Sequence, residues 1–392
     1  MTGCLQLVFL LVRKEGPSLR AMIALVSEQR MQNVIPCYQA CAAYAEVHLV
    51  RSLQADDPGL PHSRARLDTI GVLEQVTRVV DIEPAVNAFD IEATRAAVGR
   101  AAADLAGRGL EPVVNFTGGT KCMAVGAYLA AVEAGCAGLY VDTENERLLW
   151  YYQGGRMVAE PFALERVDVP LYLKTYGLTV SQHGHPERVR RLAPLLDLIL
   201  AFWPQCTPWL EEWSQKVKDH KKNALLKPAE EPGLFEERFL GGLVEAGLLE
   251  REAGGLRPTD DGVRFLTGEW LELLVYHLLR RHPGARGRGF DHVWWQVKLA
   301  GVENELDVAA TGRGRLVVIE CKSGDPGGQD TLNKLQALRH RLGLFARLCF
   351  VTSRPAEGVP SAFRERAREY GIKDIITREN LLDITALLAG RP

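Results

Sequence analysis

Two carboxylates and one ammonium stand at the ends of two predicted strands: Asp307 on the first, Glu320 and Lys322 on the second. An apolar run, residues 316–319, leads into Glu320, and a glycine-containing turn at 311–314 precedes it, which is typical of a hairpin. Side chains two positions apart on a strand share a face, so Glu320 and Lys322 project together. Magnesium and manganese favour carboxylate oxygen and water. The pattern therefore predicts a metal site that activates water against a phosphodiester, with Lys322 holding the water or the developing charge.

The flanking residues predict the elements that position this hairpin. Upstream, a helix at 269–281 carries Glu272 beside an apolar stripe. Downstream, residues 331–339 form an amphipathic, basic helix suited to a strand–helix crossover. Glu305 lies two residues before Asp307 and so on the same strand face, and whether it is also a metal ligand stays open. The further elements expected are strands at 293–299, 346–352 and 374–376 and helices at 361–370 and 380–388.

The order Asp307, twelve residues, Glu320-Cys321-Lys322 resembles the metal-dependent nuclease motif of the restriction-endonuclease-like superfamily. The resemblance implies that Asp307 and Glu320 bind Mg²⁺ or Mn²⁺, that Glu272 is an auxiliary ligand, and that Lys322 stabilises the attacking water or the phosphate charge. The competing interpretation is a surface hairpin with a Glu–Lys cross-strand pair. The apolar run that enters Glu320 favours the nuclease motif.

The first half of the chain alternates predicted strands with predicted helices. This alternation indicates an α/β fold with a parallel sheet covered on both faces, in which ligands sit beyond the carboxyl ends of the strands. An antiparallel pair is expected to follow it, at 148–152 and 156–160. The expected strands lie at 21–26, 46–50, 76–81, 112–115 and 138–141, and the expected helices at 33–45, 63–75, 91–106 and 119–133.

Two of these strand ends carry polar residues suited to a phosphate-containing ligand. Ser27 and Gln29 follow the first strand. The second stretch combines two hydroxyls, two glycines and a lysine at the start of a helix, in the order Thr117, Gly118, Gly119, Thr120, Lys121. Glycines allow close backbone approach and a helix N-terminus favours phosphate. The stretch lacks the spacing of a Walker A loop. The simpler alternative is a tight turn with a threonine cap.

A Rossmann-like domain with Ser-Glu-Gln after its first strand and Thr-Gly-Gly-Thr-Lys-x-Met at residues 117–123 resembles the CARF domain, the sensor of type III CRISPR defence. The resemblance implies a homodimer that binds a cyclic oligoadenylate, usually cyclic tetra-adenylate, across its symmetry axis. It assigns residues 117–121 to cradling the ring and Ser27 and Gln29 to contacting it.

A CARF domain followed by this acidic motif resembles the CRISPR ancillary nucleases of the Can and Card type. That resemblance implies an endonuclease acting on single-stranded RNA, single-stranded DNA or both, with nicking of supercoiled duplex. The motif does not choose among these substrates.

Length and composition limit the number of domains and the kinds of partner that the chain can have. The 392 residues suffice for two or three domains, and a net charge of -2 confines any nucleic-acid contact to a local patch. Eight cysteines without a Cys-x-x-Cys pair, and no apolar run long enough for a membrane span, indicate a soluble protein of the reducing cytoplasm. The expected divisions are an extension at 1–20, the sensor at 21–175, a helical connector resembling a winged helix at 176–262, and the nuclease at 263–392.

Three alternatives remain beside the gated nuclease. A CARF-type transcription regulator would use the connector to bind DNA without cleavage. A HEPN-type ribonuclease would need Arg and His separated by four to six intervening residues. The one match, Arg286 and His292, runs from a glycine-rich loop into a strand instead of along a helix. The sensor could also degrade its ring, although the sequence offers no clear base for that reaction.

Overall fold

The structure is a computed structural model that describes residues 19–40, 43–164, 166–230, 233–281, 289–302, 305–324 and 329–389. The chain divides into two compact units. The first comprises Met1–Arg166 and Lys174–Gly177, and the second Val167–Leu173 and Leu178–Pro392. Within the described ranges, no helix combines the length and apolarity that crossing a bilayer requires. The six cysteines placed there are free thiols.

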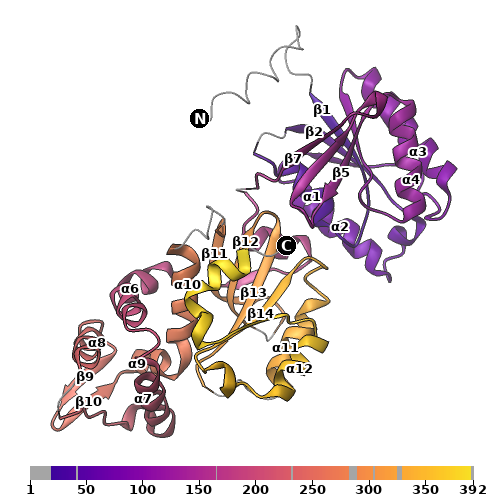
Figure 1. Ribbon diagram of the computed structural model, residues 1–392. Helices are drawn as coiled ribbons and strands as arrows, with labels where there is room; N and C mark the ends of the chain where they lie inside the picture. The colour runs from indigo at the N-terminus through magenta and orange to yellow at the C-terminus, as the bar shows by residue number, and fades with distance from the viewer. Residues whose placement is uncertain are drawn as a thin grey trace. The chain divides into compact units, whose positions relative to one another are not determined.

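The first unit is built on a seven-stranded sheet in the order β3-β2-β1-β4-β5-β6-β7 (Figure 1). The first five strands are parallel, and β6 and β7 add an antiparallel pair at one edge. The strands are β1 (Arg20–Leu25), β2 (Tyr44–Val50), β3 (Arg78–Asp81), β4 (Glu111–Asn115), β5 (Ala137–Asp142), β6 (Arg147–Tyr151) and β7 (Met157–Pro161). The helices are α1 (Met31–Cys37), α2 (Pro61–Leu73), α3 (Ile91–Gly107) and α4 (Lys121–Glu133). This sheet confirms the predicted α/β class.

Helices α3 and α4 lie side by side over one face of this sheet (Figure 1). Small residues bring them close: a Cβ added to Gly126 would stand 2.5 Å from the carbonyl oxygen of Ile91. Each helix begins at a side-chain cap. Asp90 accepts from the backbone N–H of Ala93, and Thr120 accepts from that of Met123. The cap at Thr120 places the start of α4 directly beyond the carboxyl end of β4.

The helix expected at 33–45 is wrong in its second half. Helix α1 ends at Cys37, with Pro36 in its last turn, and β2 begins at Tyr44. Arg20 pairs with Tyr44 at the start of the parallel β1–β2 ladder. Pairing with a strand distant in sequence therefore decides the conformation of residues 44–45, over their local helical pattern.

The second unit contains a six-stranded sheet in the order β15-β14-β13-β12-β11-β8 and a separate two-stranded sheet of β9 and β10. Its strands are β8 (Val180–Gln182), β9 (Leu249–Glu252), β10 (Gly255–Pro258), β11 (His292–Leu299), β12 (Glu305–Gly312), β13 (Arg315–Lys322), β14 (Arg347–Thr352) and β15 (Asp374–Ile376). Its helices are α6 (Pro186–Ala201), α7 (Thr207–His220), α8 (Leu234–Glu245), α9 (Asp260–Arg264), α10 (Trp270–Arg281), α11 (Gln329–Arg339), α12 (Ser361–Glu369) and α13 (Ile384–Ala389). Helix α5 (Val169–Thr175) lies where the chain passes between the units.

One apolar core runs through this second unit. It includes Leu192 of α6 and Trp213 of α7 together with Val308 and Ile319 of the central strands. Strand β8 pairs antiparallel with β11, so the segment after residue 178 also contributes an edge strand to the main sheet. Residues 178–262 are thus packed into the same unit as the strands that carry Asp307 and Glu320.

Candidate functional site

Strands β12 and β13 form the predicted hairpin and place its two carboxylates face to face. Val308 pairs with Ile319, so the same antiparallel register sets Asp307 opposite Glu320. The two-residue turn is Arg313–Gly314, with φ of 52° and 73°. Positive φ at both positions matches the type I′ turns that suit the twist of a tight hairpin. The turn therefore determines the register that opposes the two acids.

Glu320 is almost fully buried, at 3% exposure, and carries two ammonium partners. Nζ of Lys322 lies 2.9 Å from its Oε1, and Nζ of Lys334 donates to its Oε2 at 2.8 Å. Lys322 comes from the same strand face, whereas Lys334 comes from α11. Burial is the largest single effect and lowers the pKa of Lys322, but the charge and hydrogen bond of Glu320 together with the charge of Asp307 outweigh it, so the net pKa is raised. Lys322 is therefore a cation at neutral pH.

Asp307 is buried and accepts a hydrogen bond of 2.8 Å from the backbone N–H of Cys321. Burial, followed by the charge of Glu320, raises the pKa of Asp307 to about 6. Burial and then the charge of Asp307 raise the pKa of Glu272 on α10 to about 8. Burial and neighbouring negative charge thus disfavour the ionised forms of Asp307 and Glu272 in a poorly solvated site.

This donor set fits a hard divalent cation. Buried carboxylates that repel one another are stabilised when a cation sits among them, and Mg²⁺ and Mn²⁺ take one or two carboxylates with water completing the shell. Burial raises the pKa of Cys321 well above its usual range, so a neutral thiol stands beside the acids and not a thiolate ligand. Among the residues placed in the structure, no three His, Cys, Asp or Glu side chains stand in a ready-made ligand cluster. Asp307 and Glu320 would hold the ion, with Glu272 as the expected auxiliary acid.

Two further expectations from the sequence concern Glu305 and the HEPN motif. Glu305 faces Lys298 across the β11–β12 ladder, with Nζ and Oε2 3.8 Å apart, and its charge contributes to the raised pKa of Glu272. Arg286, on which the HEPN alternative depends, lies outside the described residues.

Between the end of β4 and the start of α4, the hydroxyls of Thr117 and Thr120 both form hydrogen bonds within the chain. The hydroxyl of Thr117 donates to Oδ1 of buried Asn115 at 2.7 Å and accepts from the backbone N–H of Val141 at 2.7 Å. The hydroxyl of Thr120 donates to the carbonyl of Ala88 and caps α4. The two threonines therefore fix the shape of the turn, as the simpler interpretation expects, and the glycines and Lys121 face a pocket.

This pocket has a volume of about 390 Å³. Its lining includes every residue from Thr117 to Lys121 and adds aromatic rings of Phe116, Tyr128 and Tyr140. The ring centroid of Phe116 lies 5.3 Å from that of Tyr128 and 5.8 Å from that of Tyr140. The N-terminus of α4 and the exposed Lys121 can hold a phosphate, and the aromatic rings can stack on a base.

Ser27 lies next to this turn, and Gln29 is hydrogen-bonded to Ser27. A Cβ added to Gly118 would lie 3.0 Å from Cβ of Ser27 and 2.6 Å from the carbonyl oxygen of Leu25, so the two strand ends touch here. The backbone N–H of Gln29 donates to the Ser27 hydroxyl at 3.1 Å, which closes a local turn. Neither residue is among those that line the pocket.

Sequence reasoning missed several residues of both sites. Lys334 was visible only as one basic position of an amphipathic helix, and the pocket's aromatic wall comes from three separate elements. Gln296 on β11 donates to Glu272 at 3.3 Å and to Glu269 at 3.4 Å, with no motif to mark it. Asn115 ends a predicted strand, and an amide at that place was the one available signal for its role.

Comparisons with known proteins agree with this arrangement. Residues 259–391 match the family described as Card1-like, endonuclease domain. No curated protein sequence matches the chain significantly. Among solved structures, protein VC1899 from Vibrio cholerae is 23% identical with a TM-score of 0.73, and alignment covers 95% of this chain and 97% of that one.

Two further solved structures share this fold. Can2 from Sulfobacillus thermosulfidooxidans, in complex with cyclic tetra-adenylate, is 21% identical with a TM-score of 0.67, covering 95% of this chain and 97% of its own. A type III CRISPR defence DNA nuclease activated by cyclic oligoadenylate is 20% identical with a TM-score of 0.54, covering 91% of this chain and 52% of its own. At these identities the likeness is one of fold. Together with the domain match, it confirms the predicted resemblance to the Can and Card nucleases.

Proposed function

We propose, from the premise that residues 259–391 form a Card1-like endonuclease domain in a chain with the fold of Can2, that this protein is a metal-dependent nuclease switched on by a cyclic oligoadenylate. The activator is cyclic tetra-adenylate, and the substrate is single-stranded RNA, single-stranded DNA or both, with nicking of supercoiled duplex. The observation that carries the proposal is the hairpin that sets Asp307 against Glu320 and brings Lys322 and Lys334 to the same carboxylate.

The catalytic roles follow from these contacts. Asp307 and Glu320 hold Mn²⁺ or Mg²⁺, with Glu272 as the auxiliary acid. When bound, such an ion supplies a nucleophilic water at neutral pH and neutralises phosphate charge. Lys322 stabilises the negative charge that develops on the phosphate or orients the attacking water, as a fixed cation in a poorly solvated site can. Lys334 orients Glu320 through the carboxylate oxygen that Lys322 does not approach.

The sensor role rests on the pocket at the start of α4. The backbone at Gly118 and Gly119 and the Lys121 ammonium receive the phosphates of the ring, and Phe116, Tyr128 and Tyr140 offer faces for its bases. Ser27 and Gln29 shape the turn next to this pocket.

An apolar stripe on the same helix supports the proposal of a homodimer. Val125, Tyr128, Leu129 and Val132 are all more than one-third exposed, at three- and four-residue spacing that puts them on one face. Helix α4 begins at the pocket, so a second copy packed on this stripe would bring two pockets together around one symmetric ring. Binding would then shift the protein towards its cleaving state.

A cleavage assay on the full chain tests the proposal. Labelled single-stranded RNA, single-stranded DNA and supercoiled plasmid are incubated with Mn²⁺ or Mg²⁺, with and without cyclic tetra-adenylate. The variants are Lys322→Ala and, as the matched control, Lys373→Ala at an exposed lysine before β15. Cutting should require ring, metal and Lys322 but not Lys373.

Two results would go against the proposal. Full activity in Lys322→Ala would refute the assignment of the site. Ring binding without any cutting would favour the alternative, a ligand-responsive regulator that binds DNA through the segment of α7, α8, β9 and β10.

A further inference from the structure

Gln296 occupies an unusual place in strand β11. Its φ is 47°, in the left-handed region, although the residue is neither glycine nor asparagine. Such a conformation is energetically unfavourable for an L-residue. It persists only where surrounding contacts enforce it, so the contacts of Gln296 require an explanation.

The interruption that Gln296 causes lies opposite a candidate metal ligand. Ladder pairs between β11 and β12 join Trp295 to Val308 and Val297 to Leu306. The register between them sets Gln296 against Asp307, and this one position is skipped in the ladder. The irregular backbone of β11 therefore lies directly opposite Asp307 of β12.

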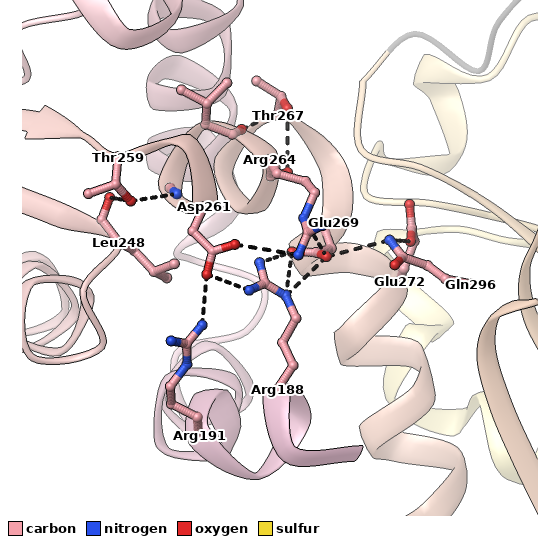
Figure 2. A network of polar contacts seen from close by, with 12 residues as sticks. Arg188, Arg191, Leu248, Thr259, Asp261, Arg264, Thr267, Glu269, Glu272 and Gln296 are labelled. Carbon is pink, nitrogen blue, oxygen red and sulfur yellow. Dashed lines mark hydrogen bonds and ion pairs between the residues drawn. The ribbon is translucent and has the colours of Figure 1, made fainter. Parts of the chain in front are cut away.

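The Gln296 amide lies between two carboxylates of the neighbouring helix. Its Nε2 is 3.4 Å from Oε1 of Glu269 and 3.3 Å from Oε2 of Glu272 (Figure 2). A primary amide has two N–H donors and can serve both acceptors at once. Glu269 ends a π-helical turn, Phe265–Glu269, and Glu272 lies in the first turn of α10, so the two acids are near neighbours on one helical segment.

Glu269 is fixed from its other side by arginines. Arg188 of α6 donates through Nε to both of its oxygens at 3.1 Å and through Nη2 to Oε2 at 2.5 Å. Nε of Arg264 lies 3.1 Å from Oε1. Arg188 and Arg191 in turn share Oδ2 of Asp261 (Figure 2). Glu269 is 3% exposed and so heavily paired that it serves as an anchor and not as a metal ligand.

We propose that Gln296 is a positioning residue of the nuclease centre: it ties the carboxylate of Glu272 to the anchored Glu269 and so holds Glu272 ready for the metal beside Asp307. The inference deepens the proposed function, on which it rests, by adding a residue outside the acidic motif. Hydrogen-bond partners that orient metal ligands typically change metal affinity or activity 10- to 100-fold when removed. Removal of the Gln296 amide should therefore weaken the affinity for Mn²⁺ more than it lowers the cleavage rate at saturating Mn²⁺.

The test variant is Gln296→Gly, which accepts the positive φ while removing the amide. Its matched control is Arg313→Gly, at another non-glycine residue of positive φ (52°) in the β12–β13 turn. Mn²⁺ binding is measured on the full chain from the loss of the free-Mn²⁺ electron paramagnetic resonance signal, with the unfolding midpoint recorded in parallel. We expect Gln296→Gly to bind Mn²⁺ 10- to 100-fold more weakly and Arg313→Gly to bind as the wild type does, with neither variant losing thermal stability.

A double-variant cycle separates positioning from a general structural effect. In a Glu272→Gln background, Gln296→Gly should weaken Mn²⁺ binding no further, because its target is gone. Gln296→Asn, which keeps an amide and tolerates positive φ, should recover part of the affinity.

The outcomes distinguish this inference from the proposed function. Wild-type Mn²⁺ affinity in Gln296→Gly, alongside metal-dependent cleavage, would overturn the positioning role alone. An additive loss in the Glu272→Gln background would also overturn it. A wild-type chain that neither binds Mn²⁺ nor cleaves would overturn both.

Discussion

The Lys334 ammonium lies 2.8 Å from Oε2 of Glu320, the oxygen opposite the one that Lys322 approaches at 2.9 Å. Helix α11 crosses from β13 to the parallel strand β14, and its buried Leu332, Leu335 and Leu338 fix its orientation. Glu320 is consequently compensated from a strand and from a helix at the same time. Each oxygen of this buried carboxylate is thus held by one ammonium, which orients the carboxylate for a metal ion.

Replacement of Lys334 should therefore impair cleavage. We expect Lys334→Ala to lower the ring-activated rate about 10- to 100-fold at saturating Mn²⁺, because Glu320 loses one of two charges that orient it. Lys334→Arg keeps the charge and should retain more activity. The measurement is the single-turnover rate on a labelled substrate, with Lys373→Ala as control. A Lys334→Ala rate within twofold of the wild type would show that Lys322 alone suffices.

The sensor turn should be sensitive to a single methyl group. In Gly118→Ala the new Cβ would meet the carbonyl oxygen of Leu25 at 2.6 Å and Cβ of Ser27 at 3.0 Å, so the backbone must move. We expect a loss of at least about tenfold in cyclic tetra-adenylate affinity by calorimetry, with Mn²⁺ binding unchanged. Gly99→Ala on α3, where a Cβ meets nothing within 4 Å, is the matched control. Equal ring affinity in both variants would contradict the placement of the ligand.

Association of two chains should depend on the exposed stripe of α4. Val132 is 51% exposed, and a charge there would be desolvated on dimerisation. We expect Val132→Asp to shift the mass measured by light scattering from dimer to monomer. Leu67→Asp on α2, at a leucine with 57% exposure, should leave the mass unchanged. A dimeric Val132→Asp protein would place the interface elsewhere.

Acid stability of the first unit should reflect Glu46. A hydrogen bond from Arg108, followed by contact with His48, lowers the pKa of this buried carboxyl to about 2 from 4.5. A depressed pKa stabilises the folded state above the unfolded value, and this contribution is lost as the pH falls from about 4.5 towards 2. Because Arg108 is partly exposed, we expect Glu46→Gln to cost only about 1–2 kcal/mol at pH 7.

The pH dependence separates ionisation from packing in that variant. The gap in unfolding midpoint between wild type and Glu46→Gln should narrow at pH 3. Glu92→Gln, at an exposed acid paired with Arg95, should show little effect at either pH. A Glu46→Gln gap of the same size at both values would mean that ionisation of Glu46 is not its source.

Local patterns were sufficient where neighbouring residues decide the structure. The turn expected at 311–314 and the apolar run into Glu320 depend on turn chemistry and strand period, and the β12–β13 hairpin confirms them. The end expected for the first strand at Asp307 is wrong, because β12 continues to Gly312. Strand β15 has the predicted bounds, and α4 starts at its threonine cap. Each of these features lies within a few residues of its cause.

Tertiary structure alone decided which distant residues complete the sites. The β1–β2 pairing that makes residues 44–45 part of a strand, the contact of Lys334 with Glu320, and the amide of Gln296 between Glu269 and Glu272 all join residues on different elements. Such contacts depend on strand order and helix packing, which no local period encodes. From its sequence alone the chain could therefore be predicted to carry Asp307, Glu320 and Lys322 on one hairpin. The ion pairs and hydrogen bonds that tune those residues form only once the elements pack, because each of these contacts joins side chains on two different elements.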